Sequence, residues 1–311
     1  MKVLCILYDD PTNGMPTSYP MEDLPVIDKY PDGMTLPSPN GRDFNPGELL
    51  GCVSGELGLR KYLEGLGHTL VVTSDKDGDG CEADKELVDS DIVISQPFFP
   101  YYVTREKMES APNLKMAITA GIGSDHVDLQ AAMDHNVDVV EVTYCNSRSV
   151  AEHIVMQILV LVRDFTTQHK IVNDGGWHIA DAVSRSYDVE GMHVGTIAAG
   201  RIGIDMLRKM KPFDVHLHYF DKHRLSNQIE TELGLTYHES VESLVAHCDV
   251  INISCPLHPE TEHMFNDELI AKCKKGAYII NTARGKICDK DAIARACESG
   301  QLSGYAGDVW F

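Results

Sequence analysis

The sequence Val194-Gly195-Thr196-Ile197-Ala198-Ala199-Gly200-Arg201-Ile202-Gly203 decides the fold, because it joins a short apolar run to a glycine-rich turn. Residues 194–199 are mostly β-prone and residues 204–210 contain helix formers, so the turn is expected to connect a strand to a helix. Small residues in such a turn let backbone N–H groups approach a pyrophosphate at the helix N-terminus. Ala198 stands where this fingerprint usually has its first glycine. The stretch predicts a dinucleotide-binding α/β domain, against the alternative of a tight turn that binds nothing.

Asp221 ends the next apolar run, residues 215–220. A carboxylate at that place accepts hydrogen bonds from the ribose hydroxyls of NAD and repels the 2′-phosphate of NADP. The sequence therefore predicts NAD as the cofactor. If Asp221 is replaced by serine, the neighbouring Lys222, His223 and Arg224 are expected to attract the phosphate of NADP.

A permanent cation follows another strand-like run. Residues 277–280 are apolar, and Asn281-Thr282-Ala283-Arg284-Gly285 comes directly after them. Open α/β sheets bind ligands beyond the carboxyl ends of their strands. Arg284 is therefore predicted to bind an anion beside the dinucleotide, with a structural ion pair as the alternative.

The composition excludes several classes of protein. The 311 residues suggest about two domains, and 27 basic against 47 acidic residues give a net charge of −20. Such a charge argues against nucleic-acid and anionic-membrane partners. None of the nine cysteines forms a C-x-x-C pair, which favours reduced thiols over a disulfide framework or a zinc site. With no membrane-length apolar run and no signal-peptide pattern at the start, a cytoplasmic protein is expected.

The order of predicted elements indicates two α/β domains. Strand-like runs at 3–8, 69–73, 92–95, 116–119 and 137–140 alternate with helix-compatible segments, and the alternation restarts around residue 194. Between them, Ser149-x-x-Glu152 resembles a capping box that opens a long apolar helix over 150–162. Residues 10–45 are rich in Pro, Gly and Asp and predict an extended surface loop that embraces a partner subunit.

Two patterns raise the question of a metal. Asp75, Asp77, Asp79, Gly80 and Glu86 satisfy the calcium-loop pattern of an EF-hand, but the pattern follows a β-like run and has no second copy. An acidic surface turn is the favoured interpretation. His258 lies between Pro256 and Pro259, and no third ligand accompanies it and His263, so a loop histidine near the cofactor is preferred. No metal site is predicted.

Five further segments resemble the NAD-dependent formate dehydrogenases of the D-2-hydroxyacid dehydrogenase superfamily, and the resemblance extends over essentially the whole chain. The segments are Gln96-Pro97-Phe98-Phe99-Pro100, residues 119–128 (TAGIGSDHVD), Cys145-Asn146-Ser147, residues 256–262 (PLHPETE) and residues 307–311 (GDVWF).

The resemblance implies roles for individual residues. Asn146, the backbone N–H of Ile122 and the charge of Arg284 would bind the formate carboxylate, with Asn146 and Arg284 as catalytic residues. Pro97 and Phe98 would form an apolar wall. Arg201 and Ile202 would meet the pyrophosphate, Asp221 the ribose and Asp308 the nicotinamide carboxamide. The remaining residues of the cofactor cleft would be Ser147, Ala198, Gly200, Gly203, Pro256, Leu257, His258, Pro259, Glu260 and Thr282.

The resemblance also implies an architecture of two doubly wound parallel-sheet domains joined by a long helix. A flavodoxin-like catalytic domain is expected over residues 1–146, a Rossmann NAD-binding domain over 147–311, and a homodimer built mainly on the cofactor domains. In that family a glutamine, a catalytic histidine and helices that return to the first domain follow the tryptophan motif. Because the sequence ends at Phe311, the return segment is expected to be absent and the NAD domain incomplete, which would lower activity.

Formate fits this site chemically, since its oxidation transfers only a hydride, whereas a 2-hydroxy acid also needs a base for its hydroxyl proton. Positioning and electrostatics are then the main tasks of the protein. Two alternatives stay open: a dehydrogenase of a larger D-2-hydroxy acid such as glycerate, which the bulk of Phe98 disfavours, and a non-catalytic NAD-binding protein that works through partners.

Overall fold

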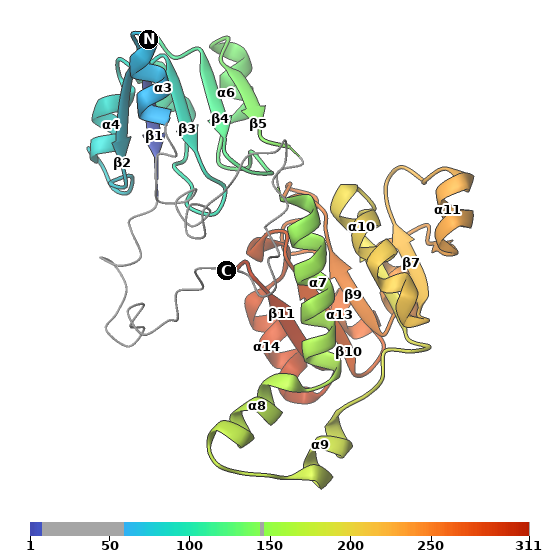
Figure 1. Cartoon of the computed structure of the whole chain (residues 1–311). Coiled ribbons are helices and arrows are strands. Elements are labelled where there is room, and N and C mark those ends of the chain that lie inside the picture. The colour runs from blue at the N-terminus through green and yellow to red at the C-terminus, as the bar shows by residue number, and fades with distance from the viewer. Residues whose placement is uncertain (8–58, 144–145, 311) are drawn as a thin grey trace. The chain divides into compact units, whose positions relative to one another are not determined.

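The computed structural model describes residues 1–7, 59–143 and 146–310, which form two compact units, Met1–Thr143 and Tyr144–Phe311 (Figure 1). The loop predicted over residues 10–45 lies outside the described residues. Each unit is built on its own parallel sheet, as the sequence predicts. Within the described ranges, no helix is both long enough and apolar enough to cross a membrane.

The first unit is a five-stranded parallel sheet in the order β2-β1-β3-β4-β5. This is the flavodoxin-like order, so the predicted fold of the first domain is confirmed. Its elements are β1 Lys2–Ile6, α3 Leu59–Gly65, β2 Thr69–Thr73, α4 Glu82–Leu87, β3 Ile92–Ser95, α5 Arg105–Ser110, β4 Met116–Thr119, α6 Leu129–Asp134 and β5 Asp138–Glu141.

Helices cover both faces of the first sheet because its central strands are apolar on both sides. In β1, Leu4 and Ile6 point to a core shared with α4, α5 and α6, while Val3 and Cys5 point to the opposite face with α3. This two-sided burial is typical of parallel strands connected by helices.

The second unit is a six-stranded sheet in the order β11-β10-β9-β6-β7-β8, also parallel throughout. The order reverses between β6 and β9, as in a Rossmann fold, where this switch point marks the dinucleotide site. Its elements are α7 Ser147–Val162, α8 Phe165–Asn173, α9 Ile179–Arg185, β6 His193–Ile197, α10 Arg201–Met210, η4 Lys211–Phe213, β7 His216–Phe220, α11 Asn227–Leu233, β8 Leu235–Tyr237, α12 Val241–His247, β9 Val250–Ile253, α13 Asp267–Lys272, β10 Ala277–Asn281, η5 Gly285–Ile287, α14 Lys290–Ser299 and β11 Leu302–Gly307.

Two apolar cores enclose the second sheet. On one face α7 and α10 lie side by side (Figure 1). They pack together through fully buried residues such as Ile154, Ile158 and Met206. On the other face α12, α13 and α14 contribute Leu244, Ile270 and other buried residues. The long helix predicted from its apolar run is thus a core element of the cofactor unit.

The start of that helix and the domain boundary differ from the prediction. Helix α7 begins at Ser147 with Asn146 as its N-cap residue, so Ser149 lies inside the first turn and the predicted capping box does not form. The carbonyl of Asn146 accepts the first helical bond, 2.9 Å from the N of Val150. The two compact units divide between Thr143 and Tyr144, three residues before the boundary predicted after residue 146.

One strand was not predicted. Strand β8 has three residues, Leu235–Tyr237, and follows Gly234, which ends α11 in the left-handed conformation. Three residues are too few to show the period of a strand.

Helices α8 and α9 extend away from the sheet of their unit (Figure 1). Neither helix contains a buried residue. Several large apolar side chains of this segment are exposed: Phe165 (56%), Trp177 (77%), Ile179 (62%) and Val183 (74%). Together these residues form an apolar arm, which we define as residues 165–187.

Five histidines gather at one end of β6 and β7. His193 Nδ1 lies 2.8 Å from His218 Nε2, and His218 Nδ1 lies 3.0 Å from His238 Nε2. His238 Nδ1 in turn lies 2.8 Å from Ser243 Oγ. His216 stacks on His193, and the ring of His247 lies 5.3 Å from that of His238. We call this group the imidazole chain.

The imidazole chain makes the unit sensitive to acid. Burial, together with the neighbouring imidazoles, lowers the pKa of His218 to about 4, and burial also lowers the pKa values of His193 and His238. Asp249 and Lys274 are the other charged groups at His193, and they form an ion pair with each other.

We expect the free energy of unfolding to fall as the pH is lowered from about 6.5 towards 4. Between these pH values His218 is protonated in the unfolded state but stays neutral in the folded state. This difference lowers the free energy of unfolding by up to about 3 kcal/mol. Urea unfolding at pH 7, 6 and 5 would measure this effect. His218→Gln should flatten the slope of stability against pH, whereas His135→Gln, on the other unit, should leave it unchanged. Parallel slopes for His218→Gln and the parent would contradict the prediction.

Candidate functional site

The glycine-rich turn has the predicted strand-turn-helix geometry. It leaves β6 at Ala198, whose N–H donates to Phe220 O at 2.8 Å, and enters α10 with Gly200 as the N-cap residue. A Cβ atom on Gly203 would lie only 2.4 Å from Ala198 O, so glycine is required for the helix to approach the strand. A Cβ on Gly200 would meet no atom within 4 Å. The glycine at 200 therefore leaves open space, which suits the backbone's approach to a pyrophosphate.

Ala198 adopts a left-handed backbone conformation, with φ +71°. This conformation costs an alanine about 1 kcal/mol, and it explains why the position usually carries glycine.

We expect Ala198→Gly to raise the free energy of unfolding by about 0.5 kcal/mol, because relief of the left-handed strain exceeds the added entropy of the unfolded chain. Ala199→Gly is the matched control, since Ala199 is buried and not among the residues with positive φ. That control should lower stability. Urea unfolding measures both, and destabilisation by Ala198→Gly would refute the assignment of strain.

Asp221 supports the same turn. Its Oδ2 accepts a hydrogen bond from the N–H of Ala199 at 2.8 Å, and its Oδ1 accepts one from the N–H of His223 at 2.8 Å. The predicted discriminating acid thus also holds the glycine-rich turn, a role that its position in the sequence did not indicate.

The loop after β9 carries the predicted residues Pro256 to Glu260. Thr261 folds this loop, because its Oγ1 donates to Pro256 O and accepts from the N–H of His258, both at 2.8 Å. Sequence reasoning gave Thr261 no role. Cys255, which precedes the loop, is buried, and burial raises the pKa of its thiol to about 11.

The loop after β10 presents Thr282 and Arg284. Asn281 is fully buried, and its Nδ2 donates to Arg284 O at 2.9 Å while its Oδ1 accepts from the N–H of Ala283 at 3.1 Å. Arg284 Nη1 donates to Ala283 O at 2.7 Å. The backbone that carries the cation is therefore fixed by the side chain of the last strand residue.

Asp308 comes to the neighbouring position of the sheet edge. Asn281 pairs with Gly307 in the register of β10 and β11, so Thr282 and Asp308 each follow a paired residue. A Cβ on Gly307 would lie 2.4 Å from Asn281 O, which requires glycine there. Partial burial raises the pKa of Asp308, although His153 on α7, 3.8 Å away, opposes the shift. Sequence reasoning did not find His153.

Ser147 offers a further sign of a missing partner. It is buried at the first residue of α7, and its Oγ has no hydrogen-bond partner among the described residues. Buried hydroxyls normally have a partner. An orphaned hydroxyl, the open space at Gly200, the N-terminus of α10 and the Asp221 carboxylate together fit a bound dinucleotide.

In the first unit, Pro97 and Phe98 follow β3, and Ile122 follows the neighbouring strand β4. The two turns contact each other, since a Cβ on Gly121 would lie 2.7 Å from Pro97 Cγ. The side chain of Phe98 is 59% exposed. The structure thus brings the three predicted wall and substrate residues of this unit together at one sheet edge.

No metal centre accompanies these residues. Across residues 1–7, 59–143 and 146–310, no three His, Cys, Asp or Glu side chains are placed to hold a metal ion. In the acidic turn, Asp75 Oδ2 instead accepts from the N–H of Glu82, and Glu86 forms an ion pair with Lys2.

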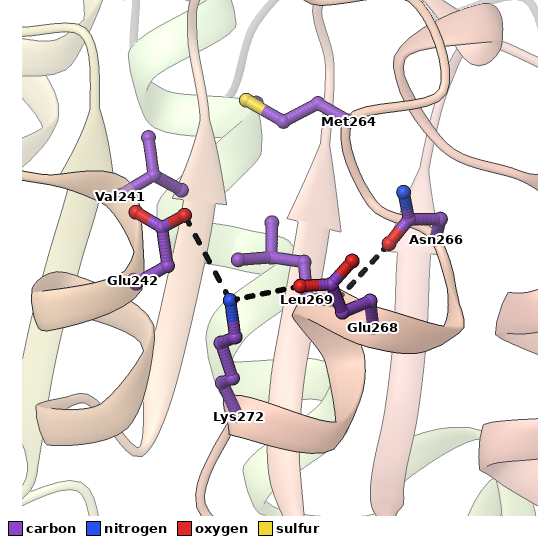
Figure 2. A pocket seen from close by; sticks show the side chains of 7 residues that line it. All are labelled: Val241, Glu242, Met264, Asn266, Glu268, Leu269 and Lys272. Atoms are coloured by element: carbon purple, nitrogen blue, oxygen red, sulfur yellow. Dashed lines mark hydrogen bonds and ion pairs between the residues drawn. The ribbon is translucent and has the colours of Figure 1, made fainter.

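A shallow depression of about 230 Å³ lies between α12 and α13 (Figure 2). Lys272 there forms ion pairs with Glu242 and Glu268. The depression is lined by Val241, Glu242, Met264, Asn266, Glu268, Leu269 and Lys272. None of these is a predicted site residue, so we do not assign the depression to the site.

Comparison with known proteins agrees with this geometry. Residues 155–311 match the family model for the NAD binding domain of D-isomer specific 2-hydroxyacid dehydrogenases. The chain is 65% identical over 310 residues to a formate dehydrogenase of Pseudomonas sp. (strain 101), covering all of this chain and 77% of the relative. A solved formate dehydrogenase of Granulicella has a TM-score of 0.88 at 61% identity, covering 100% of this chain and 83% of that one. An NAD complex of the Staphylococcus aureus formate dehydrogenase has a TM-score of 0.77 at 36% identity, covering 100% and 82%.

Proposed function

We propose, from the premise that this chain belongs to the D-isomer specific 2-hydroxyacid dehydrogenase family and within it to the NAD-dependent formate dehydrogenases, that it oxidises formate to carbon dioxide. The chain is an oxidoreductase and its cofactor is NAD. The comparisons favour formate over a larger D-2-hydroxy acid and over a non-catalytic role.

The single observation that supports this function best is the fixed Arg284 loop at the carboxyl edge of the NAD-binding sheet. Formate is an anion without a side chain, and a guanidinium can bind its two oxygens through parallel hydrogen bonds. NAD, when bound, accepts the hydride. The protein's own residues then need to bind and orient the carboxylate, because no hydroxyl proton has to be removed.

The further substrate contacts are part of the proposal. Asn146 and the N–H of Ile122 would donate to the formate carboxylate together with Arg284, and Pro97 and Phe98 would exclude water. A drier site strengthens the attraction between the guanidinium and the carboxylate. In this assignment residues 1–146 supply the substrate wall and residues 147–311 bind NAD.

The cofactor contacts are also part of the proposal, and the geometry of the second unit supports them. The N–H groups at Arg201 and Ile202, in the first turn of α10, would bind the pyrophosphate, with Ala198, Gly200 and Gly203 shaping the turn. Asp221 would accept from the ribose hydroxyls. Ser147, Thr282 and Asp308 would contact the nicotinamide half, and the 256–260 loop would line the cleft.

NADH production from formate, glycerate and lactate tests the proposal. We expect turnover with formate and none above background with the other two acids. Preference for glycerate or lactate would show a 2-hydroxyacid dehydrogenase, and NAD binding without turnover of any acid would show a non-catalytic protein.

We also propose a homodimer in which a second copy covers the apolar arm. Large apolar side chains that gather on one exposed segment mark interaction surfaces, and homodimers with a self-complementary patch are the commonest oligomers. The arm belongs to the cofactor unit, where the family resemblance implies the dimer interface.

Two charges in the arm should separate the dimer. We expect Trp177→Glu with Val183→Glu to give particles of 34.4 kDa by light scattering, against twice that mass for the parent. The physical reason is the desolvation of two carboxylates in an apolar interface. Met133→Glu, which changes another well-exposed apolar residue (65%) on the first unit, is the control and should remain dimeric. A monomeric parent, or a dimeric double variant, would contradict the proposal.

We place the protein in the cytoplasm, with its cysteines as thiols. Seven cysteines lie within the described residues, none in a disulfide, and six of them are buried. Such thiols are typical of a reducing compartment.

A further inference from the structure

The cations after Asp221 are already engaged by carboxylates. Arg224 Nε and Nη2 lie 2.9 and 3.0 Å from the two oxygens of Glu230, and the guanidinium lies 5.0 Å from the centre of the Tyr237 ring. Because Arg224 already binds Glu230 and lies over Tyr237, it is a poor candidate for binding a cofactor phosphate.

The side chain of Lys222 also has a carboxylate partner, which comes from a loop after a different strand. Its Nζ forms an ion pair with Glu260 in the loop after β9. Both side chains are 68% exposed, so the pair is held weakly and either partner can move away. The backbone of Glu260 is better fixed, because Thr261 ties this loop together at Pro256 and His258.

Asp221 has a structural role besides its predicted role in cofactor choice. Its two oxygens accept from the N–H groups of Ala199 and His223. Replacing it removes a negative charge and also loosens the phosphate-binding turn. That Asp221→Ser favours NADP stays a prediction, and this role of Asp221 and the carboxylates on Lys222 and Arg224 should limit the gain.

We propose that Glu260 is a second specificity-determining residue for the cofactor. The inference rests on the proposed NAD-dependent function. Lys222 is the residue next to Asp221, and Asp221 is where the ribose 2′-hydroxyl is expected. Glu260 neutralises the nearest available cation and adds a negative charge of its own, so a 2′-phosphate meets repulsion from two acids and attraction from none.

Removal of the Glu260 charge should therefore favour NADP through Lys222. Charges at the protein surface act over distances shorter than about 10 Å at ordinary salt, so a change of one charge beside a phosphate alters affinity about tenfold. The effect should weaken at high salt, and the net gain over the parent should vanish when Lys222 is also made neutral, because one charge of each sign is then lost.

Isothermal titration calorimetry with NAD, NADP and adenosine 2′,5′-bisphosphate tests this on the parent, Glu260→Gln, Lys222→Gln and the double variant. We expect Glu260→Gln to lower the ratio of the NADP Kd to the NAD Kd about tenfold and to tighten binding of the bisphosphate similarly. The matched control is Glu262→Gln, an exposed acid in the same loop, which should change the ratio less than about twofold. The double variant should return to the parent's ratio.

Equal ratios for Glu260→Gln and Glu262→Gln would overturn the inference, as would a double variant that favours NADP over the parent as strongly as Glu260→Gln does. The formate assay on the parent distinguishes a failure of the proposed Glu260 role from a failure of the proposed function. A parent that reduces NAD with formate while Glu260→Gln leaves NADP binding unchanged refutes only the role of Glu260. A parent that neither binds NAD nor oxidises formate refutes the proposed function itself.

Discussion

Replacing Arg284 by alanine is expected to lower kcat/KM for formate by at least about 100-fold while the Kd for NAD changes little. The guanidinium is the proposed partner of the substrate carboxylate, and loss of a charged hydrogen-bonding group in a water-poor site costs about 3 kcal/mol. The loop itself should persist, because Asn281 fixes it through the carbonyl of Arg284 and the N–H of Ala283, which alanine retains.

Steady-state kinetics with formate and calorimetry with NAD measure the two effects separately. Lys286→Ala is the matched control, since it removes an exposed cation two residues further along and should keep most of the activity. If Arg284→Ala retained the activity of the control, Arg284 would be a structural residue and the anion site would lie elsewhere.

Gly203→Ala is expected to lower the free energy of unfolding more than a methyl group added at any other position of the glycine-rich turn between β6 and α10. The new Cβ would lie 2.4 Å from Ala198 O, 3.2 Å from Thr196 Oγ1 and 3.3 Å from Ala198 C. Two of these atoms are backbone, so strand β6 and helix α10 must move apart, at a cost of about 3 kcal/mol. A lower urea midpoint and a lower Tm should both report it.

Gly200→Ala separates packing from cofactor binding. Its φ is −72°, and the added methyl group meets no protein atom within 4 Å, so stability should stay within about 0.5 kcal/mol of the parent. NAD affinity should fall, because the methyl group occupies the space where the backbone approaches the pyrophosphate. Equal stability of Gly203→Ala and Gly200→Ala would disprove the close contact at Gly203.

The fold could be predicted from the sequence because parallel strands are buried on both faces and appear as short apolar runs. The runs at 69–73, 92–95 and 116–119 coincide with β2, β3 and β4. Helix starts were less predictable. The apolar run of α7 was visible, but its first turn, Ser147 to Val150, has no apolar period, and Asn146 makes no side-chain cap bond that the sequence would signal.

Most of the predicted site residues were chosen because they follow a strand, and strand ends are visible in the sequence. What those residues bond to could not be predicted. Asn281 binding the Arg284 loop, Thr261 folding the 256–260 loop and Glu260 meeting Lys222 all join positions whose distance in space depends on loop conformation. Local sequence patterns carry no information on such pairings.

The two hydrogen bonds accepted by Asp221 impose an order on any mutational path towards a different cofactor. A first step at Asp221 leaves the N–H of Ala199 without its acceptor, so the intermediate has a less ordered turn before any gain with the new cofactor. Replacing Asp221 by asparagine or glutamine keeps an uncharged acceptor, so the turn should lose less stability than it does with serine or alanine. A path that begins at Glu260 avoids it, since that exposed carboxylate has no part in the turn.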